Sequence, residues 1–270
     1  MKTRIIAAVA LLPLLLLIVL AAPKVFTAIL FGAMAAIGAY ELLSGTGLVK
    51  HFRLNIYSMV MAFWCCLWCG LGLGYSWLLL GILLFWVGLM AEVMLSEMKL
   101  GFSKVALCFV AGLVLPMLLA SLVRIHSWEK GRHLIFVPFM FAFLSDTGAY
   151  FAGLKFGKHK LAPVISPKKT VEGVVGGMAA TVVGMLIYCV IMQYAFKMQP
   201  NYVFAVFYGL IGSVTSVFGD LCFSVVKRQT GIKDYGNLIP GHGGILDRFD
   251  SMMLAGPLAE VMLLLLPLMV

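Results

Sequence analysis

The residues with the chemical character of a catalytic site lie together near the carboxyl end of the chain. Between residues 218 and 251 an otherwise apolar sequence becomes polar, and it has five glycines between residues 231 and 244. Its acidic and basic side chains are Asp220, Asp234, Asp247, Asp250, Lys227, Arg228, Lys233, Arg248 and His242. Carboxylates can hold a metal ion, and lysine and arginine can hold phosphate. This pairing is what phosphoryl or nucleotidyl transfer requires.

The spacing of these residues predicts two helices joined by a loop. Four polar residues recur at helical spacing and would share one face: Asp220, Ser224, Lys227 and Arg228. Asp247, Asp250 and Ser251 would also share a face if a second helix begins near them. The segment 240–244 between the helices contains one proline and three glycines, so we expect a loop whose backbone N–H groups can approach an anion.

Three segments carry a more specific pattern. The longest is Ser224-x-x-Lys227-Arg228-x4-Lys233-Asp234-x4-Ile239-Pro240-x-His242-Gly243-Gly244-x-x-Asp247-Arg248-x-Asp250. The other two are Ser166-Pro167-Lys168-Lys169-Thr170-Val171-Glu172-Gly173 and Ser145-Asp146-Thr147-Gly148-Ala149-Tyr150. Together they resemble the signature of the phosphatidate cytidylyltransferases, also called CDP-diacylglycerol synthases. The resemblance covers the carboxyl-terminal half of the chain, whereas residues 1–130 match only as generic membrane helices.

The resemblance implies that CTP and phosphatidate react to give CDP-diacylglycerol and pyrophosphate. It also implies Mg2+ as cofactor, leaves a second metal ion open, and suggests a homodimer. A phosphate monoester is already a charged nucleophile, so the protein need not supply one. The protein must instead offset the repulsion between two polyanions, which carboxylate-bound Mg2+ and basic side chains can do.

The polar residues of these segments receive expected roles on this basis. Asp220 and Asp247 are the first choices as Mg2+ ligands, and Asp250 and Asp146 are the second choices. The expected catalytic residues are Asp220, Asp247, Lys227 and Arg228. The expected substrate-binding residues are Lys168, Lys169, Ser224, Lys233, His242, Gly243, Gly244 and Arg248.

Simpler roles stay open for several of these residues. Lys233 can be a solvated loop lysine, and Ser224 can simply pack. His242 can be a structural loop histidine, and Asp234 can orient Lys233 rather than bind metal.

The composition indicates an all-α, polytopic integral membrane protein. Hydrophobic residues make up 63% of the 270 residues and charged residues 11%, whereas a soluble domain has about 25% charged residues. The net charge of +9 therefore indicates basic loops near anionic lipid rather than nucleic-acid binding. Cys66 and Cys69 have the spacing of a metal or redox pair, but a second pair is missing and the surroundings are apolar. We therefore interpret the six cysteines as residues of membrane helices.

Apolar stretches bounded by charged residues predict about nine transmembrane helices. They are Ile5–Ala22, Val25–Leu43, Asn55–Leu73, Trp77–Leu95, Val105–Val123, His133–Leu154, Gly173–Tyr194, Tyr202–Val226 and Phe249–Val270. We expect one continuous membrane domain, with about five spans in residues 1–130 and a catalytic part in residues 131–270. The catalytic part would carry cytoplasmic loops at 155–172 and 227–248. A signal peptide is the alternative for the first stretch. The length of the stretch and the poor cleavage site at its carboxyl end favour a retained helix.

The distribution of basic residues predicts the orientation. With this set of spans, 15 of the 20 lysines and arginines lie on the side of the amino terminus. This bias predicts that the amino terminus and both loops face the cytoplasm, and that the protein lies in the cytoplasmic (inner) membrane. Asp220 lies about 10 Å and Asp146 about 13 Å along their helices from the next lysine, at 1.5 Å per residue. Two carboxylates at similar depth suggest a polar cavity that opens to the cytoplasm and to the lipid.

Two other classes of function compete with this hypothesis. A CDP-alcohol phosphotransferase would carry a D-G-x-x-A-R … G-x-x-x-D-x-x-x-D run, which the sequence lacks. A transporter of organic anions would usually show inverted repeats and paired broken helices, and none is evident.

Overall fold

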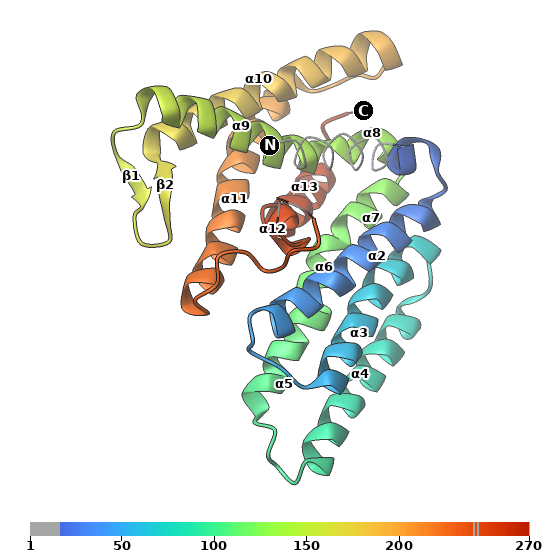
Figure 1. Cartoon of the computed structure of the whole chain (residues 1–270). Coiled ribbons are helices and arrows are strands. Elements are labelled where there is room, and N and C mark those ends of the chain that lie inside the picture. Colours follow the sequence, from blue (N-terminus) through green and yellow to red (C-terminus); the bar gives the residue numbers. More distant parts are fainter. Residues whose placement is uncertain (1–16, 240, 242, 270) are drawn as a thin grey trace. The chain divides into compact units, whose positions relative to one another are not determined.

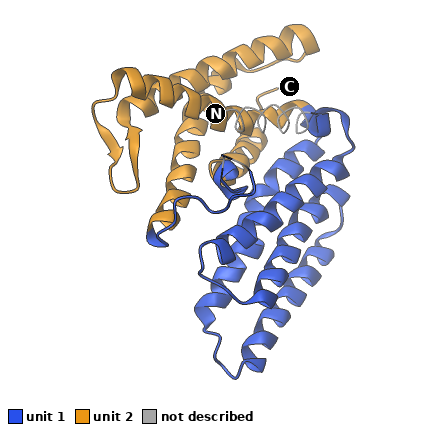
Figure 2. Cartoon of the chain, in the orientation of Figure 1, with its two compact units in different colours: residues 1–132, 229–249 blue, residues 133–228, 250–270 orange. Residues whose placement is uncertain are grey.

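The computed structural model describes residues 17–239, 241 and 243–269, which fall into two compact units. Unit 1 comprises residues 1–132 and 229–249, and unit 2 comprises residues 133–228 and 250–270 (Figure 2). Residues 229–249, which contain much of the polar signature, therefore belong to the same unit as the amino-terminal helices.

Unit 1 is built from apolar helices packed side by side. Its elements are α2 (Lys24–Tyr40), the π-helical turn η1 (Glu41–Gly45), α3 (Phe52–Leu71), α4 (Tyr75–Leu95), α5 (Phe102–Phe109), the π-helical turn η2 (Val110–Val114), α6 (Leu115–Leu119), α7 (Ser121–Ser127) and the short α12 (Leu246–Phe249). Helix α3 packs against both α2 and α4 (Figure 1). A Cβ atom on Gly70 would lie 2.2 Å from the Cβ atom of Ala28, so the absence of a side chain there lets α2 and α3 approach closely.

Unit 2 is organised around a pair of long helices. It contains α9 (Phe136–Phe156), β1 (Lys160–Ala162), β2 (Ser166–Thr170), α10 (Val171–Phe196), α11 (Tyr202–Gln229) and α13 (Met252–Leu265), and α8 (Gly131–Leu134) lies at the boundary between the units. Helix α9 packs against α10 and also against α13 (Figure 1). A Cβ atom on Gly176 would lie 2.1 Å from the Cβ atom of Ala152, which accounts for the close packing of α9 and α10.

The segment expected as a loop at 155–172 is ordered. Helix α9 continues to Phe156, α10 begins at Val171, and the two strands between them pair antiparallel, with Lys160 opposite Thr170 and Ala162 opposite Ser166. The fold is therefore nearly all-α, and the expected connection between the two helices contains one two-stranded hairpin. Helix α11 continues to Gln229, and the connection that follows it begins at Thr230.

Seven helical stretches of the described residues are long and apolar enough to cross a membrane. They are Lys24–Gly45, Phe52–Leu71, Tyr75–Leu95, Phe102–Ser127, Gly131–Phe156, Val171–Phe196 and Tyr202–Gln229. They correspond to the second through eighth expected spans, and they support an integral membrane protein. Most of the first expected span, Ile5–Ala22, lies outside the described residues.

The last expected span, Phe249–Val270, is not one helix. Helix α12 ends at Phe249, and α13 begins at Met252 and ends at Leu265 after 14 residues. Such a helix is about 21 Å long, whereas a hydrocarbon core is about 30 Å thick.

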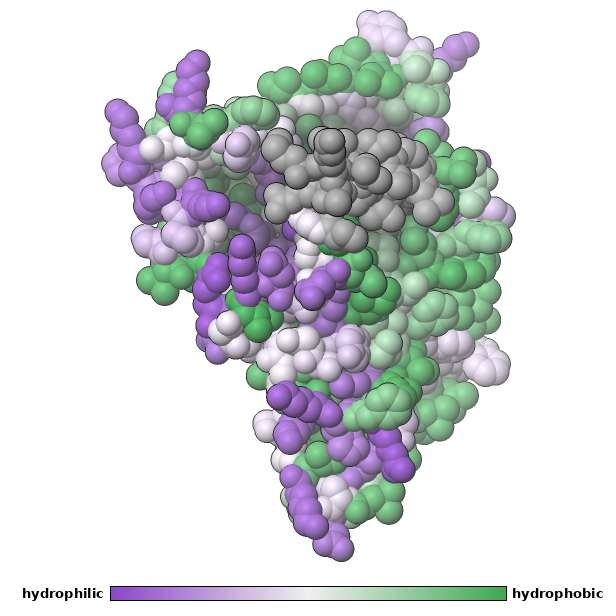
Figure 3. Space-filling model, viewed as in Figure 1, coloured by the Kyte–Doolittle hydropathy of each residue, from purple (hydrophilic) through white to green (hydrophobic). Residues whose placement is uncertain are grey.

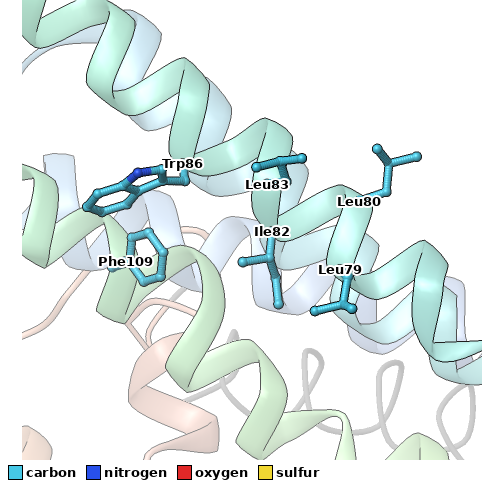
Figure 4. Close-up of a pocket in the computed structure, with 6 residues that line it drawn as sticks. All are labelled: Leu79, Leu80, Ile82, Leu83, Trp86 and Phe109. Atoms are coloured by element: carbon cyan, nitrogen blue, oxygen red, sulfur yellow. The ribbon is translucent and has the colours of Figure 1, made fainter.

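The outer surface of the α4 helix is strongly apolar. Hydrophobic side chains dominate this part of unit 1 in the view of Figure 3. A shallow pocket of about 540 Å³ lies between α4 and α5 and is lined by Leu79, Leu80, Ile82, Leu83, Trp86 and Phe109 (Figure 4). The lining contains no titratable side chain, so this surface suits acyl chains rather than a polar substrate.

Candidate active site

Asp220 forms the centre of an acid–base group in unit 2. It lies on α11, and the hydroxyl of Ser224, one turn later, donates a hydrogen bond of 3.2 Å to its Oδ1 atom. Lys169 of strand β2 forms an ion pair with the Oδ2 atom, with 2.5 Å between the charged atoms. The expected helical face of Asp220 and Ser224 is thus confirmed, and a lysine of the hairpin supplies a cation to this carboxylate.

Asp250 lies next to this group, in the turn between α12 and α13. Its side chain is buried, and its Oδ1 atom accepts a hydrogen bond of 2.7 Å from the backbone N–H of Ser251. Burial and then the negative charge of Asp220 raise the pKa of Asp250 to about 7, and Lys227 acts in the opposite direction. Asp146, which is exposed on α9, adds a smaller effect that also raises this pKa. The site therefore concentrates negative charge, as a cation site does.

A glycine allows this close arrangement. A Cβ atom on Gly219 would lie 3.1 Å from the carbonyl oxygens of Asp250 and Ser251. Helix α11 can therefore approach the turn closely at the residue before Asp220, which explains the electrostatic effect of Asp220 on Asp250.

The hairpin that carries Lys169 is held at both ends. At its base, the carboxylate of Glu172 accepts hydrogen bonds from the backbone N–H groups of Lys158 and His159, and it contacts the His159 ring at 2.6 Å. Thr170 caps α10 by accepting a 3.1 Å hydrogen bond from the N–H of Gly173. At the other end, the Nε atom of Arg228 donates to the carbonyl oxygen of Ile165 at 3.1 Å.

The two hairpin lysines face different surroundings. Lys168 is exposed, whereas Lys169 is partly buried against Asp220. Arg228, an exposed residue, uses its Nε atom to hold the hairpin. The expected basic residues are therefore present beside the acidic group, but Lys169 and Arg228 already take part in protein contacts.

In unit 1, Asp247 organises the glycine-rich connection. Its buried Oδ2 atom accepts hydrogen bonds from the backbone N–H of Tyr235 at 2.8 Å and of Gly244 at 3.0 Å. The N–H of Gly244, which we expected to bind phosphate, is thus used by a carboxylate. Ile239 and Gly243 pair across the turn, where Gly243 has a φ of +85°, a conformation that favours glycine.

The same connection encloses a polar pocket of about 460 Å³. It is lined by Lys233, Asp234, Gly236, Asn237, Ile239, Gly241, Gly243 and Arg248. The structure therefore brings together three of the expected substrate-binding residues, Lys233, Gly243 and Arg248, and adds Asp234. His242 lies outside the described residues. Two cationic side chains at one small pocket suit a phosphate-bearing ligand.

Sequence reasoning missed Glu41, which ends α2. This side chain is only 4% exposed, and its two oxygens accept the backbone N–H groups of Ile245 and Leu246 at 3.0 and 2.8 Å. The signal that could have found it is a carboxylate inside an otherwise apolar span, because such a group needs a partner.

The described residues contain no group of three or more histidine, cysteine, aspartate or glutamate side chains arranged to hold a metal ion. Mg2+, however, is commonly held by one or two carboxylates together with substrate phosphates. The oxygen donors of Asp220 and Asp250 are chemically compatible with such a cation, and the pKa of Asp250 is raised by burial and then by the charge of Asp220.

Comparisons with known proteins identify relatives of the chain. A family model described as "Cytidylyltransferase family" matches residues 2–266. A phosphatidate cytidylyltransferase of Staphylococcus saprophyticus is 36% identical over 176 residues, and those of Staphylococcus haemolyticus and Staphylococcus aureus strain COL are 38% identical over 176 and 175 residues. Each match covers 65% of this chain and 65% of the relative's length.

Proposed function

The chain belongs to the cytidylyltransferase family, and from this premise we propose that it transfers the cytidylyl group of CTP to phosphatidate, giving CDP-diacylglycerol and pyrophosphate. The observation that carries the proposal is the acidic group around Asp220 and Asp250, with Lys169 bound to it, in a family that uses a nucleoside triphosphate. The names of the relatives supply phosphatidate as the acceptor.

The reaction requires no protein nucleophile. A phosphate oxygen of phosphatidate attacks the α-phosphorus of CTP, and the bond from that phosphorus to the bridging oxygen breaks. Pyrophosphate leaves with the bonding electron pair. The protein must hold two polyanions together, so charge neutralisation and positioning supply the catalysis.

Basic side chains near each acidic group would bind the phosphates. Lys233 and Arg248 line the pocket of unit 1, and we assign them to the triphosphate of CTP. In unit 2, we assign three further basic residues to phosphate oxygens of the substrates: Lys168, Lys227 and Arg228. Lys168 is the neighbour of Lys169, and Lys227 and Arg228 follow Asp220 on α11. Ser224 orients Asp220 through its hydrogen bond rather than binding phosphate.

Mg2+ would be held by carboxylates in this proposal. Asp220 and Asp250 would be its ligands in unit 2, Asp247 and Asp146 are further candidates, and a second ion stays open. Bound there, Mg2+ supplies neutralisation of phosphate charge. The residues of the chain provide the oxygen donors, and Lys169 must give up its contact with Asp220 for that carboxylate to bind the ion.

The cellular setting follows from the distribution of charge. We propose that the enzyme lies in the inner membrane with its amino terminus and active site facing the cytoplasm, where CTP is present, and that it acts as a homodimer. The 15 basic residues on the proposed cytoplasmic side support this orientation.

A direct assay tests the activity. Purified protein in detergent with phosphatidate, CTP and Mg2+ should release pyrophosphate and convert labelled CTP into a chloroform-soluble product. The product should be absent without the divalent cation. A transporter would release no pyrophosphate, and an alcohol phosphotransferase would consume CDP-diacylglycerol, so either result in place of the expected one contradicts the proposal.

A further inference from the structure

We propose that Glu41 is a positioning residue that holds the two ends of the glycine-rich segment, residues 235–236 and 244–246, in the conformation that forms the polar pocket, so that CTP binding depends on it. Glu41 lies far from the signature in sequence and is absent from every role assigned above. The inference rests on the proposed function for the identity of the ligand, but its structural part stands on the contacts alone.

The contacts of Glu41 bind the start of α12. The N–H groups at the first turn of a helix lack partners within the helix. Glu41 supplies partners for two of them, because Oε1 accepts from Ile245 and Oε2 accepts from Leu246, residues 204 and 205 positions away in the chain. Together with the bond from Gly244 to Asp247, three consecutive backbone N–H groups are held by two buried carboxylates.

The connection also wraps tightly around the Glu41 carboxylate. A Cβ atom on Gly236 would lie 2.7 Å from Oε1, and one on Gly244 would lie 2.5 Å from the same oxygen. Gly236 lines the pocket and Glu41 does not, so Glu41 supports the pocket wall at Gly236 from behind. Glycine at both positions is therefore required by the carboxylate rather than by a positive φ.

The local helix geometry brings the end of α2 against the glycine-rich connection. Helix α2 changes to a π-helical turn at Glu41, and this turn ends the helix at Gly45. π-Helical turns are rare in proteins. A Cβ atom on Gly45 would lie 2.4 Å from the carbonyl oxygen of Tyr235, so this turn and the connection are in direct contact.

Substitution of Glu41 by glutamine tests the inference. The amide oxygen can accept one N–H, but the amide nitrogen then faces the second donor, so one charge-assisted bond is lost. We expect E41Q to raise the KM for CTP about tenfold or more, as for the loss of one charged hydrogen bond, with a change of less than about twofold in the KM for phosphatidate. E41D keeps the charge and should recover part of the affinity. G236A should reproduce the effect of E41Q by pushing against the carboxylate.

Glu92 provides a matched control. It is a second buried glutamate of unit 1, and it contacts Arg53 and Tyr57 rather than the glycine-rich segment. E92Q should leave both KM values within about twofold of the wild-type values. An unchanged KM for CTP in E41Q, or an equal rise in both KM values, would overturn the inference.

Hydrogen exchange of the full-length protein separates this inference from the proposed function. E41Q should accelerate exchange at the amides of Ile245 and Leu246 by about tenfold or more, and E92Q should not. If the wild-type protein fails to use CTP, the proposed function is wrong, yet accelerated exchange would still establish the positioning by Glu41. Unchanged exchange in E41Q would refute that positioning even in an active enzyme.

Discussion

At the scale of single residues, the contact between Lys169 and Asp220 has a direct consequence for cation binding. The lysine ammonium pairs with the Oδ2 atom of Asp220, and a metal ion held by this carboxylate would compete with it. Lys169 should therefore raise the concentration of metal ion needed to displace it.

Replacing Lys169 by methionine should separate these effects. K169M should lower the Mg2+ concentration required for half-maximal activity several-fold, because the competing charge is gone, and should raise the KM for a phosphate-bearing substrate. A Mg2+ titration of activity measures the first effect. The control is K168M, since the neighbouring lysine is exposed and should leave the Mg2+ dependence unchanged. A higher Mg2+ requirement in K169M would show that the lysine assists metal binding instead.

The two central aspartates should differ in their contributions to stability. D220N and D247N should each reduce turnover by orders of magnitude, because Asp220 is a proposed Mg2+ ligand and Asp247 is a further candidate that also holds the glycine-rich connection. D247N should also lower the free energy of unfolding by about 1–3 kcal/mol, since its carboxylate holds two backbone N–H groups. D220N should unfold close to the wild-type temperature, because Asp220 is partly exposed.

Thermal melting in detergent together with pyrophosphate release checks this contrast. E129Q is a suitable control for both, because Glu129 is exposed in the connection between α7 and α8 and has no proposed role. Near-wild-type turnover of either aspartate variant at saturating Mg2+ would remove that residue from the metal site.

At the scale of elements, the β1–β2 hairpin determines where its two lysines lie. The hairpin has only two strands, which by themselves are marginally stable in water. Its order therefore depends on the carboxylate of Glu172 at its base and on Arg228 at its tip.

Removing the contact between Glu172 and the backbone at the start of the hairpin should loosen the hairpin without affecting the helices. E172A should accelerate hydrogen exchange of the Lys160–Thr170 amides and reduce kcat/KM, while the helical circular dichroism stays unchanged. T170S, which keeps the hydroxyl that caps α10, should leave exchange near the wild-type rate. If E172A exchanges like the wild type, other contacts hold the hairpin and the assigned role of Glu172 is wrong.

At the scale of the whole molecule, the number of membrane crossings decides which connections face the cytoplasm. Two candidate spans, α10 and α11, separate the hairpin from the glycine-rich connection, so both connections should face the same side. We expect that side to be the cytoplasm, because lysine and arginine are in excess in the connections assigned to it.

A topology reporter tests this orientation and the count of spans. A carboxyl-terminal fusion to a protein that fluoresces only in the cytoplasm should be silent if the last stretch crosses the membrane, and a fusion after Lys99 should fluoresce. The short α13 makes this a sharp test, because its 14 residues are fewer than the roughly 20 that a span requires. Fluorescence of the carboxyl-terminal fusion would show that α13 does not cross.

Local chemistry determined much of what was predictable from the sequence. Apolar composition and length located the seven described spans, because partition into lipid depends on stretches of neighbouring residues. Helical periodicity placed Asp220 and Ser224 together, as their hydrogen bond shows. The typed positions of the signature indicated the family that the family model matches. The spacing rules could not predict the hairpin or the break before α13, because these depend on cross-strand pairing and on turns.

Only the tertiary structure decided which groups neutralise one another. Glu41 binds amides about two hundred positions away, and Lys169 of the hairpin reaches Asp220 of α11, so no periodicity in the chain relates these partners. The structure likewise showed that the N–H of Gly244 belongs to Asp247 rather than to a ligand. A buried carboxylate takes whichever donors the packed backbone offers it, and those donors are defined only once the helices and the glycine-rich connection have come together.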